Sequence, residues 1–182
     1  PKYDWEVPFL KGTYGQCFRN TFEDIEYSIN LMNECGTKQE FEIFDLGQIN
    51  NVAYFVKKGI VKKPLFLQFV LGVMGGAPLT LDNLVHCVNQ AKQLLGDDIQ
   101  YSIVAGGRRL FRYGVFNVIN GGNCRVGMED SLLINATGTL ARSNAEQVEK
   151  MVQLLELLDF EIASPDAARE MLQLKGAANV NF

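Results

Sequence analysis

Short apolar runs recur along this chain and are separated by stretches with helical periodicity. Buried strands are predicted at residues 40–45, 65–71, 99–105 and 124–129, and residues 5–10 form a weaker candidate. Each run is bounded by glycine, proline or charged residues, which is typical of strands buried on both faces of a parallel sheet.

Polar capping residues followed by apolar stripes predict four helices between and after these strands. The helices begin at Thr21, Thr80, Ser143 and Ser164-Pro165. Ser143 has Glu146 three residues on, which is the spacing of a capping box, and proline is favoured at the first helical position.

Strands and helices in alternation indicate βαβ units, which form either a doubly wound open sheet or a (β/α)8 barrel. Two features favour the barrel. Polar Glu42, Arg125 and Glu129 alternate with apolar neighbours, and no glycine-rich dinucleotide motif follows the early strands. We predict that residues 1–182 form a single domain, an α/β fold that is an incomplete (β/α)8 TIM barrel with about the last four or five β/α units.

The composition fits one globular core, since 47% of the residues are apolar and 21% are charged. A net charge of −4 argues against nucleic acid as the main partner. No apolar run is long enough to cross a membrane, and no signal peptide is visible, so we expect a cytoplasmic protein without a membrane partner. The cysteines are then expected to be buried, reduced thiols: Cys17, Cys35, Cys87 and Cys124.

The strongest candidate site is the segment from Arg125 to Asp130. In a strand, Arg125 and Glu129 would share a face, and Asp130 would fall where the strand gives way to its loop. Barrel enzymes keep their catalytic groups at that position, and a guanidinium with two carboxylates suits acid–base and metal chemistry. An internal ion pair that supports the rim is the alternative.

Three weaker candidates lie at the ends of other predicted strands. Glu42 would face inward, where it needs a cationic ligand or a partner such as Arg125. Gly75 and Gly76 could let backbone N–H groups approach a ligand, or could form a flexible turn. Arg108 lies at a strand end and a helix start, which suits an anion or a solvated basic face.

In order and spacing, these stretches resemble the motifs of the beta-keto acid cleavage enzyme family, whose founding activity is 3-keto-5-aminohexanoate cleavage in lysine fermentation. The resemblance covers nearly the whole chain. The matching motifs are Glu42-x-x-Asp45-x-Gly47, Phe69–Gly72 with Gly75-Gly76, Gly107-Arg108, Arg125–Asp130 and Leu140–Glu146.

The resemblance implies a barrel that holds one zinc ion and cleaves a beta-keto acid with acetyl-CoA, giving acetoacetyl-CoA and a second product. It also implies a homo-oligomer, which in the family is a tetramer. By motif, Glu129 would be a zinc ligand, and Arg125 and Asp130 the acid–base and charge-handling pair. The substrate-binding residues would be Glu42, Gly75, Gly76 and Arg108.

The chain departs from the family pattern in ways that leave the keto acid open. Asn123-Cys124 precedes the arginine motif, Arg109-Leu110 follows Arg108, Ser131 follows the acidic pair, and Met74 precedes the double glycine. These positions carry other residues in most of the family.

The family zinc site also needs two histidines from an early strand and a further carboxylate, which this chain lacks. Its single histidine, His86, lies within a predicted amphipathic helix and is not expected to bind metal. Catalytic zinc takes about three protein ligands. We therefore expect the 182 residues alone to bind zinc weakly and to be inactive. A truncated or degenerate relative that serves as a binding or assembly subunit, and an unrelated barrel lyase with another metal, are the alternatives.

Overall fold

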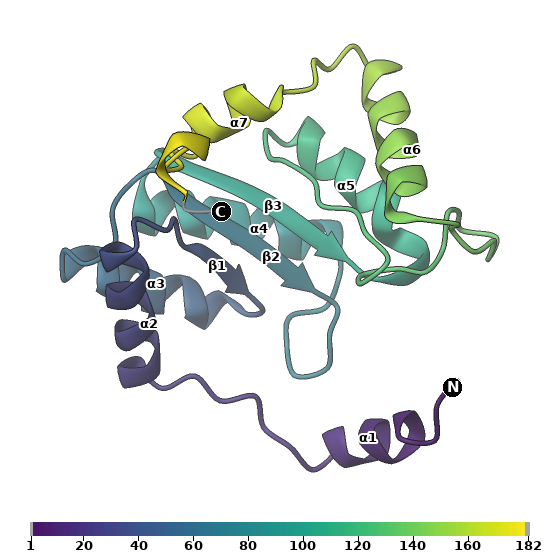
Figure 1. Ribbon diagram of the computed structural model, residues 1–182, viewed down its shortest axis with the longest axis horizontal. Coiled ribbons are helices and arrows are strands. Elements are labelled where there is room, and N and C mark those ends of the chain that lie inside the picture. Colours follow the sequence, from purple (N-terminus) through teal and green to yellow (C-terminus); the bar gives the residue numbers. More distant parts are fainter. Residues whose placement is uncertain (1, 181–182) are drawn as a thin grey trace.

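Three parallel strands form the centre of the molecule. The computed structural model describes residues 2–180, and within them the sheet has the order β1-β2-β3 (Figure 1). The strands are β1 (Glu40–Ile43), β2 (Leu65–Leu71) and β3 (Ile99–Ala105). Because consecutive strands are parallel, each connection has to cross back over the sheet, and it does so through one helix.

Seven α-helices and two short 3-10 turns complete the described part of the chain. The helices are α1 (Glu6–Thr13), α2 (Phe22–Glu34), α3 (Leu46–Lys57), α4 (Leu81–Leu95), α5 (Leu110–Ile119), α6 (Asn144–Glu156) and α7 (Pro165–Met171), and the turns are η1 (Gly107–Arg109) and η2 (Ala177–Asn179).

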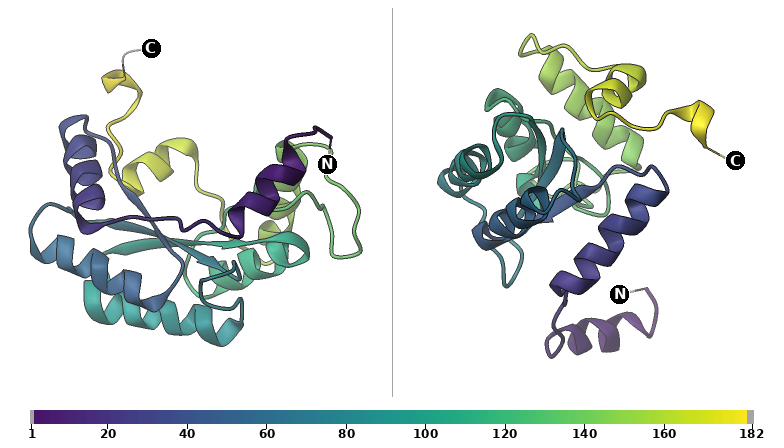
Figure 2. Two further views of the ribbon diagram at one scale, coloured as in Figure 1. Left: turned by 90° about the horizontal axis from the view of Figure 1, so that it is seen from below. Right: turned by 90° about the vertical axis from the view of Figure 1, so that its left-hand side faces the viewer.

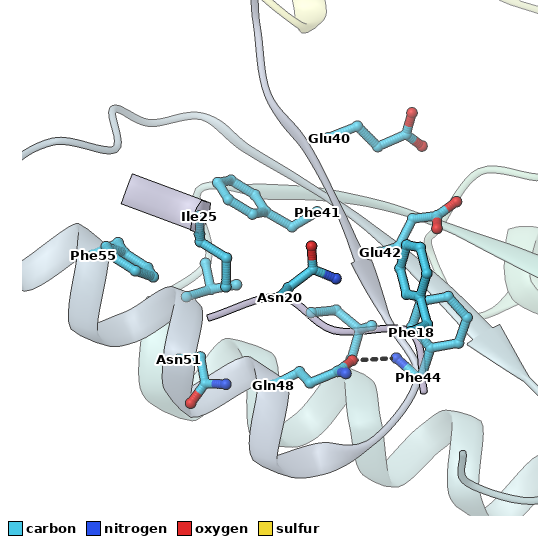
Figure 3. Close-up of a pocket in the computed structure, with 12 residues that line it drawn as sticks. Phe18, Asn20, Ile25, Glu40, Phe41, Glu42, Phe44, Gln48, Asn51 and Phe55 are labelled. Atoms are coloured by element: carbon cyan, nitrogen blue, oxygen red, sulfur yellow. Dashed lines mark hydrogen bonds between the residues drawn. The ribbon is translucent and has the colours of Figure 1, made fainter. Parts of the chain in front are cut away.

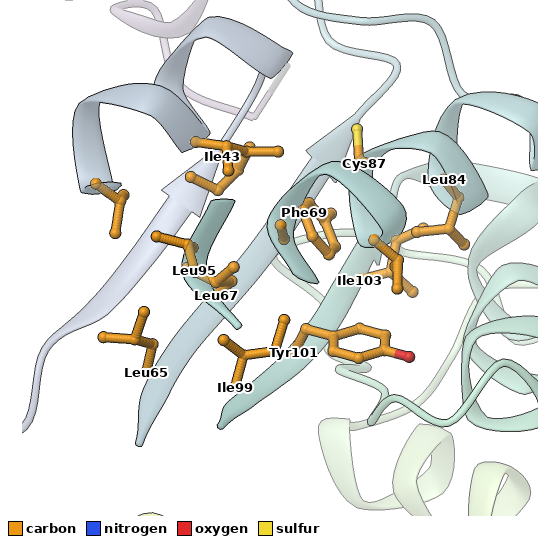
Figure 4. Close-up of a cluster of buried hydrophobic side chains, with 14 of the residues drawn as sticks. Ile43, Leu65, Leu67, Phe69, Leu84, Cys87, Leu95, Ile99, Tyr101 and Ile103 are labelled. Atoms are coloured by element: carbon orange, nitrogen blue, oxygen red, sulfur yellow. The ribbon is translucent and has the colours of Figure 1, made fainter. Parts of the chain in front are cut away.

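Helices α3 and α4 cover one face of the sheet and form the apolar core with it (Figure 4). Alternate residues of each strand point to these helices, because successive side chains of a strand lie on opposite faces. The fully buried members include Ile43, Leu67, Phe69, Ile103 and Leu84.

The opposite face of the sheet is polar along one row. Glu42 of β1 is in register with Gln68 of β2, and Gln68 is in register with Ser102 of β3. Gln68 and Ser102 are each only 3% exposed. Buried polar side chains need hydrogen-bond partners, so this row marks a built polar face and not a solvated surface.

The remaining helices lie around this sheet (Figure 2). Helix α2 packs on α3 through Phe22, which contacts Tyr54 and Phe55. Helix α5 packs on β3, and α6 packs on α5. Helix α1 lies apart from the sheet, and its Trp5 and Phe9 are 63% and 60% exposed.

The structure confirms strands in three of the predicted places. All four predicted helices are present, and they are preceded by Thr21, Thr80, Ser143 and Ser164 as N-caps. The predicted box at Ser143 is half formed, since Glu146 accepts instead from the backbone N–H of Arg142. Helix α3 had no predicted counterpart. Its N-cap is Asp45, placed by the sequence prediction inside a strand.

The prediction of a strand at residues 124–129 is wrong. Residues 122–127 have no regular secondary structure and a turn follows, with the N–H groups of Asp130 and Ser131 both donating to Gly127 O at 3.1 Å. One backbone bond, from Asn123 N to Tyr101 O at 2.7 Å, connects the start of this stretch to β3. A strand needs a continued ladder, and here the turn takes up the backbone groups locally.

Two further expectations need correction. The weaker strand candidate at residues 5–10 falls in helix α1, whose backbone bonds are local, for example Phe9 N to Trp5 O at 3.0 Å. The cysteines are free as expected, but Cys17 and Cys35 are exposed, because they lie in the surface segments on either side of α2.

Among the residues that the structure describes, no helix is both long and apolar enough to cross a membrane.

Truncating the core should cost much of the stability. Leu67 is fully buried at the centre of β2. We expect Leu67→Ala to lower the free energy of unfolding by about 2–5 kcal/mol, from lost burial and the cavity left behind. Leu94→Ala, at a leucine that is 44% exposed, should change it by less than about 0.5 kcal/mol. Urea titration measures both, and an equal loss in the two variants would contradict this packing.

Candidate active site

The Arg125 guanidinium is the centre of a polar cluster on the open face of the sheet. Its Nε donates to Asp130 Oδ2 at 2.9 Å, and its Nη2 donates to Asp130 Oδ1 at 3.0 Å. The Asp130 side chain is only 7% exposed. A bidentate pair fixes the plane of the guanidinium as well as its position.

Two more carboxylates face the same guanidinium from the solvent side. Nη2 donates to Glu129 Oε2 at 2.8 Å, and Glu42 Oε1 lies 3.9 Å from Nη1. These side chains are 85% and 49% exposed. The predicted convergence of Arg125, Glu129 and Asp130 is thus present, although the segment is a turn and not a strand.

Tight packing at the start of this segment points Arg125 toward the sheet. The Cβ atom that any other residue would have at Gly122 would lie 2.4 Å from the Tyr101 ring. A Cβ added at Gly114 of α5 would lie 3.2 Å from Cys124 Cβ, and burial raises the pKa of the Cys124 thiol to about 11. Because Cys124 faces the helices, Arg125 lies on the other side of the chain.

Asp130 is held by bonds from neighbouring loops. Its carbonyl oxygen accepts from Gly107 N at 3.1 Å, directly after β3. Two residues earlier, Met128 N donates at 2.7 Å to Oδ1 of Asn144, the first residue of α6. The connection between β3 and α5 and the turn at residues 128–130 therefore meet at the carboxyl end of the sheet.

Sequence reasoning missed Gln68, Glu40 and Ser102, which complete the cluster. Gln68 Oε1 accepts from Arg125 Nη1 at 2.8 Å. Its Nε2 donates to Glu40 Oε1 at 2.7 Å and to Ser102 Oγ at 3.2 Å. The available signal was a polar residue inside each of the apolar runs 65–71 and 99–105.

Glu40 lies in an environment that disfavours its charge. Partial burial raises its pKa above the ordinary value of 4.5, Arg125 opposes that rise, and nearby Glu42 adds to it. Burial of a carboxylate favours its neutral form.

The motif around Glu42 also has a structural part. Asp45 Oδ1 accepts from Gly47 N at 3.2 Å and caps α3. Gly76 lies against the end of β1, where a Cβ would be 2.8 Å from Phe44 O. Gly75 has φ +86° with open space around it. The double glycine thus fits a close approach of two loops, with Gly75 exposed at the rim.

The structure does not bring the Arg108 side chain into the Arg125 cluster. Arg108 is exposed on η1, and its Nη1 donates to Ala136 O at 3.0 Å. It contacts the 133–140 hairpin, which lies beyond Asp130 in the chain.

A cavity of about 500 Å³ lies along the outer edge of β1 (Figure 3). The carboxylates of Glu40 and Glu42 lie at one side of it, and Phe18 and Asn20 approach β1 from the segment before α2. At its lower end Gln48 Oε1 accepts from Phe44 N at 2.7 Å. The cavity therefore adjoins the polar cluster through its two glutamates.

Residues 2–180 contain no group of three or more histidine, cysteine, aspartate or glutamate side chains arranged to hold a metal ion. Glu129 could supply one oxygen ligand, and His86 is exposed on α4, which covers the other face of the sheet. Catalytic zinc takes about three protein ligands, so the described residues do not make a zinc centre by themselves.

The model of one protein family, the beta-keto acid cleavage enzymes, matches residues 6–174. The chain belongs to this family. It is 45% identical over its full length to a 3,5-dioxohexanoate:acetyl-CoA acetone transferase from Paraburkholderia graminis. It is 36% identical, over 88% of its length, to a 3-keto-5-aminohexanoate cleavage enzyme from Fusobacterium nucleatum. A 3-dehydrocarnitine:acetyl-CoA trimethylamine transferase from Rhizobium meliloti is 32% identical over 85% of it.

The chain spans between 50% and 58% of the length of these family members. It covers 58% of the Paraburkholderia protein, 56% of the Fusobacterium protein and 50% of the Rhizobium protein.

The raised pKa of Glu40 predicts a distinct dependence of stability on pH. A carboxyl whose pKa is raised by folding stabilises the fold below its unfolded pKa, and that contribution is lost as pH rises through the folded pKa. Glu40→Gln keeps the side chain neutral. Relative to the unmodified chain, its free energy of unfolding should therefore increase between about pH 3 and about pH 7.

Glu146→Gln is the opposite control. The backbone N–H of Arg142 lowers the pKa of Glu146, so that the variant should lose stability over the same rise in pH. Urea titrations at several pH values measure both trends. A parallel trend in the two variants would show that Glu40 is not desolvated.

Proposed function

We propose that this chain contributes the Arg125 cluster to an enzyme that cleaves a beta-keto acid with acetyl-CoA, giving acetoacetyl-CoA and a second product. Family membership and the activities for which the relatives are named support this proposal. The observation that carries it is the guanidinium of Arg125, which is clamped by Asp130 and lies beside half-exposed Glu42.

The chemistry needs a positive group at this place. Breaking a carbon–carbon bond beside a ketone builds negative charge on the carbonyl oxygen. A fixed guanidinium stabilises that charge at little cost in reorganisation. Asp130 orients Arg125, and as a carboxylate it is also the group that would take up or return a proton.

Zinc enters the proposal through Glu129. The resemblance assigns this residue as a metal ligand, and its exposed carboxylate is available for one coordination bond. Zinc would supply a Lewis acid that polarises the keto acid carbonyl. Since the described residues offer too few ligands, further ligands would have to come from outside them.

We further propose that the sheet belongs to a (β/α)8 barrel. Three consecutive parallel strands with helices α3 and α4 on one face and a polar row on the other support this proposal. Strands of such a barrel carry their catalytic groups at the carboxyl ends, where Glu42 and Asp130 lie. The free edge of β1 would then pair with another strand.

The remaining family assignments suit the two substrates. Glu42 would contact the variable end of the keto acid, while Gly75 and Gly76 would leave space for it at the rim. Arg108, which is exposed and has no ion-pair partner within residues 2–180, would serve the anionic acetyl-CoA. As in the family, the protein would act as a tetramer.

Activity tests of this proposal use the chain alone and the chain joined to the part of the Paraburkholderia relative that the alignment leaves uncovered. We expect acetoacetyl-CoA formation and bound zinc only in the joined protein. Arg125→Lys should lower its kcat by about 10²-fold or more, because lysine cannot form the fork to Asp130.

Matched controls distinguish this result from misfolding. Arg169→Lys removes a guanidinium from an exposed pair with Asp166 and should leave kcat unchanged. A folded joined protein without activity would contradict the proposed reaction. Cleavage by the 182 residues alone would refute the expectation that they are insufficient.

Glu42→Gln tests the substrate assignment. The variant removes a negative charge that would pair with an amine. We expect a larger loss of kcat/KM on 3-keto-5-aminohexanoate than on 3,5-dioxohexanoate, by about 10-fold or more, since hydrogen bonds between charged groups contribute about 1.5–3 kcal/mol. Steady-state kinetics of the joined protein measure both substrates. Equal losses on the two would remove the assignment.

A further inference from the structure

Gln68 lies at the centre of the polar face and is almost fully buried, with 3% exposed. It makes three hydrogen bonds with three different strands or loops. Its Oε1 accepts from Arg125 at 2.8 Å, and its Nε2 donates to Glu40 at 2.7 Å and to Ser102 at 3.2 Å. No motif of the family resemblance depends on it.

These partners allow only one orientation of the Gln68 amide. The guanidinium of Arg125 only donates hydrogen bonds, so it needs the amide oxygen. The carboxylate of Glu40 only accepts when ionised, so it needs the amide N–H. A flipped amide would set donor against donor and acceptor against acceptor in a buried place. The hydroxyl of Ser102 can donate or accept and does not decide the orientation.

The same contacts hold the guanidinium by both of its edges. Asp130 binds the edge formed by Nε and Nη2, and Gln68 binds Nη1 on the other side. Of the five N–H groups of Arg125, Glu129 takes a further one at Nη2. One N–H of Nη1 remains, on the side where Glu42 Oε1 lies 3.9 Å away. That distance is too long for a hydrogen bond, so this N–H is available to a ligand oxygen.

We propose that Gln68 is a positioning residue, which turns the remaining Nη1 N–H of Arg125 toward the substrate, and that Glu40 fixes the orientation of the Gln68 amide. The consequence for catalysis rests on the proposed function. The orientation of Arg125 does not, because it concerns contacts within this chain.

Side-chain ¹⁵N NMR of the 182-residue chain tests the orientation without turnover. The Arg125 guanidinium signals are those lost in Arg125→Lys. Gln68→Met keeps the length of the side chain but removes the acceptor, and we expect hydrogen exchange of the guanidinium protons to become about 10-fold faster or more. Gln68→Glu keeps an oxygen acceptor toward Arg125 and should keep the slow exchange.

Gln39→Met is the matched control. Gln39 is also buried, with 6% exposed, but it donates to Asn33 and not to the Arg125 cluster. Its substitution should leave Arg125 exchange unchanged. Glu40→Met should give a smaller increase than Gln68→Met, because Arg125 still requires the amide oxygen and only the second restraint on the amide is lost. Ser102→Ala should give less still.

The outcomes separate this proposal from the proposed function. Unchanged exchange in Gln68→Met, or equal acceleration in Gln39→Met, would overturn the positioning role whatever the activity assays give. If Gln68→Met does not fold, as judged by circular dichroism, the other two variants are compared. Slow exchange in Gln68→Glu together with faster exchange in Glu40→Met would support the positioning role, and unchanged exchange in Glu40→Met would overturn it. In the active joined protein, Gln68→Met should lower kcat with little change in KM, and Gln68→Glu should restore part of kcat. An unchanged kcat would refute the catalytic consequence alone.

Discussion

The polar face of this molecule depends on the groups that pair with one cation, the guanidinium of Arg125. A guanidinium withdrawn from water is costly unless it is paired and hydrogen-bonded. Arg125 meets this requirement through bidentate Asp130, through Glu129 and through Gln68. The partners come from a turn and from the middle strand, so the charge ties a loop to the sheet and sets the position of both.

The two faces of the sheet differ in character: one packs the apolar core and the other carries the polar cluster. Leucine, isoleucine and phenylalanine side chains pack against α3 and α4 and supply most of the buried apolar area. This leaves the other face able to carry Glu40, Gln68 and Ser102, and the hydrogen bonds among them offset the cost of burying Gln68 and Ser102. A rigid apolar layer behind a polar row is a suitable support for a guanidinium that must keep one orientation.

Membership in the beta-keto acid cleavage enzyme family places this cluster in a chemical context. The chain contains the Arg125–Asp130 motif and the rim residues around Glu42, whereas its described residues hold no metal cluster. The relatives are named for activities on an amine-bearing and on a dioxo substrate. Within this cluster Glu42 is half exposed beside Arg125, and Glu129 is more exposed still.

The amino-acid sequence was enough to predict the strands at 65–71 and 99–105, the helix starts at Thr21, Thr80, Ser143 and Ser164, and the Arg125–Asp130 motif, because periodicity, caps and motifs are local properties. It did not determine that residues 124–129 form a turn, or that Gln68 and Glu40 join the cluster. Those outcomes depend on which groups become neighbours across 57 residues of sequence, as in the Arg125–Gln68 bond. Only the tertiary structure decides which donor meets which acceptor once water has been excluded.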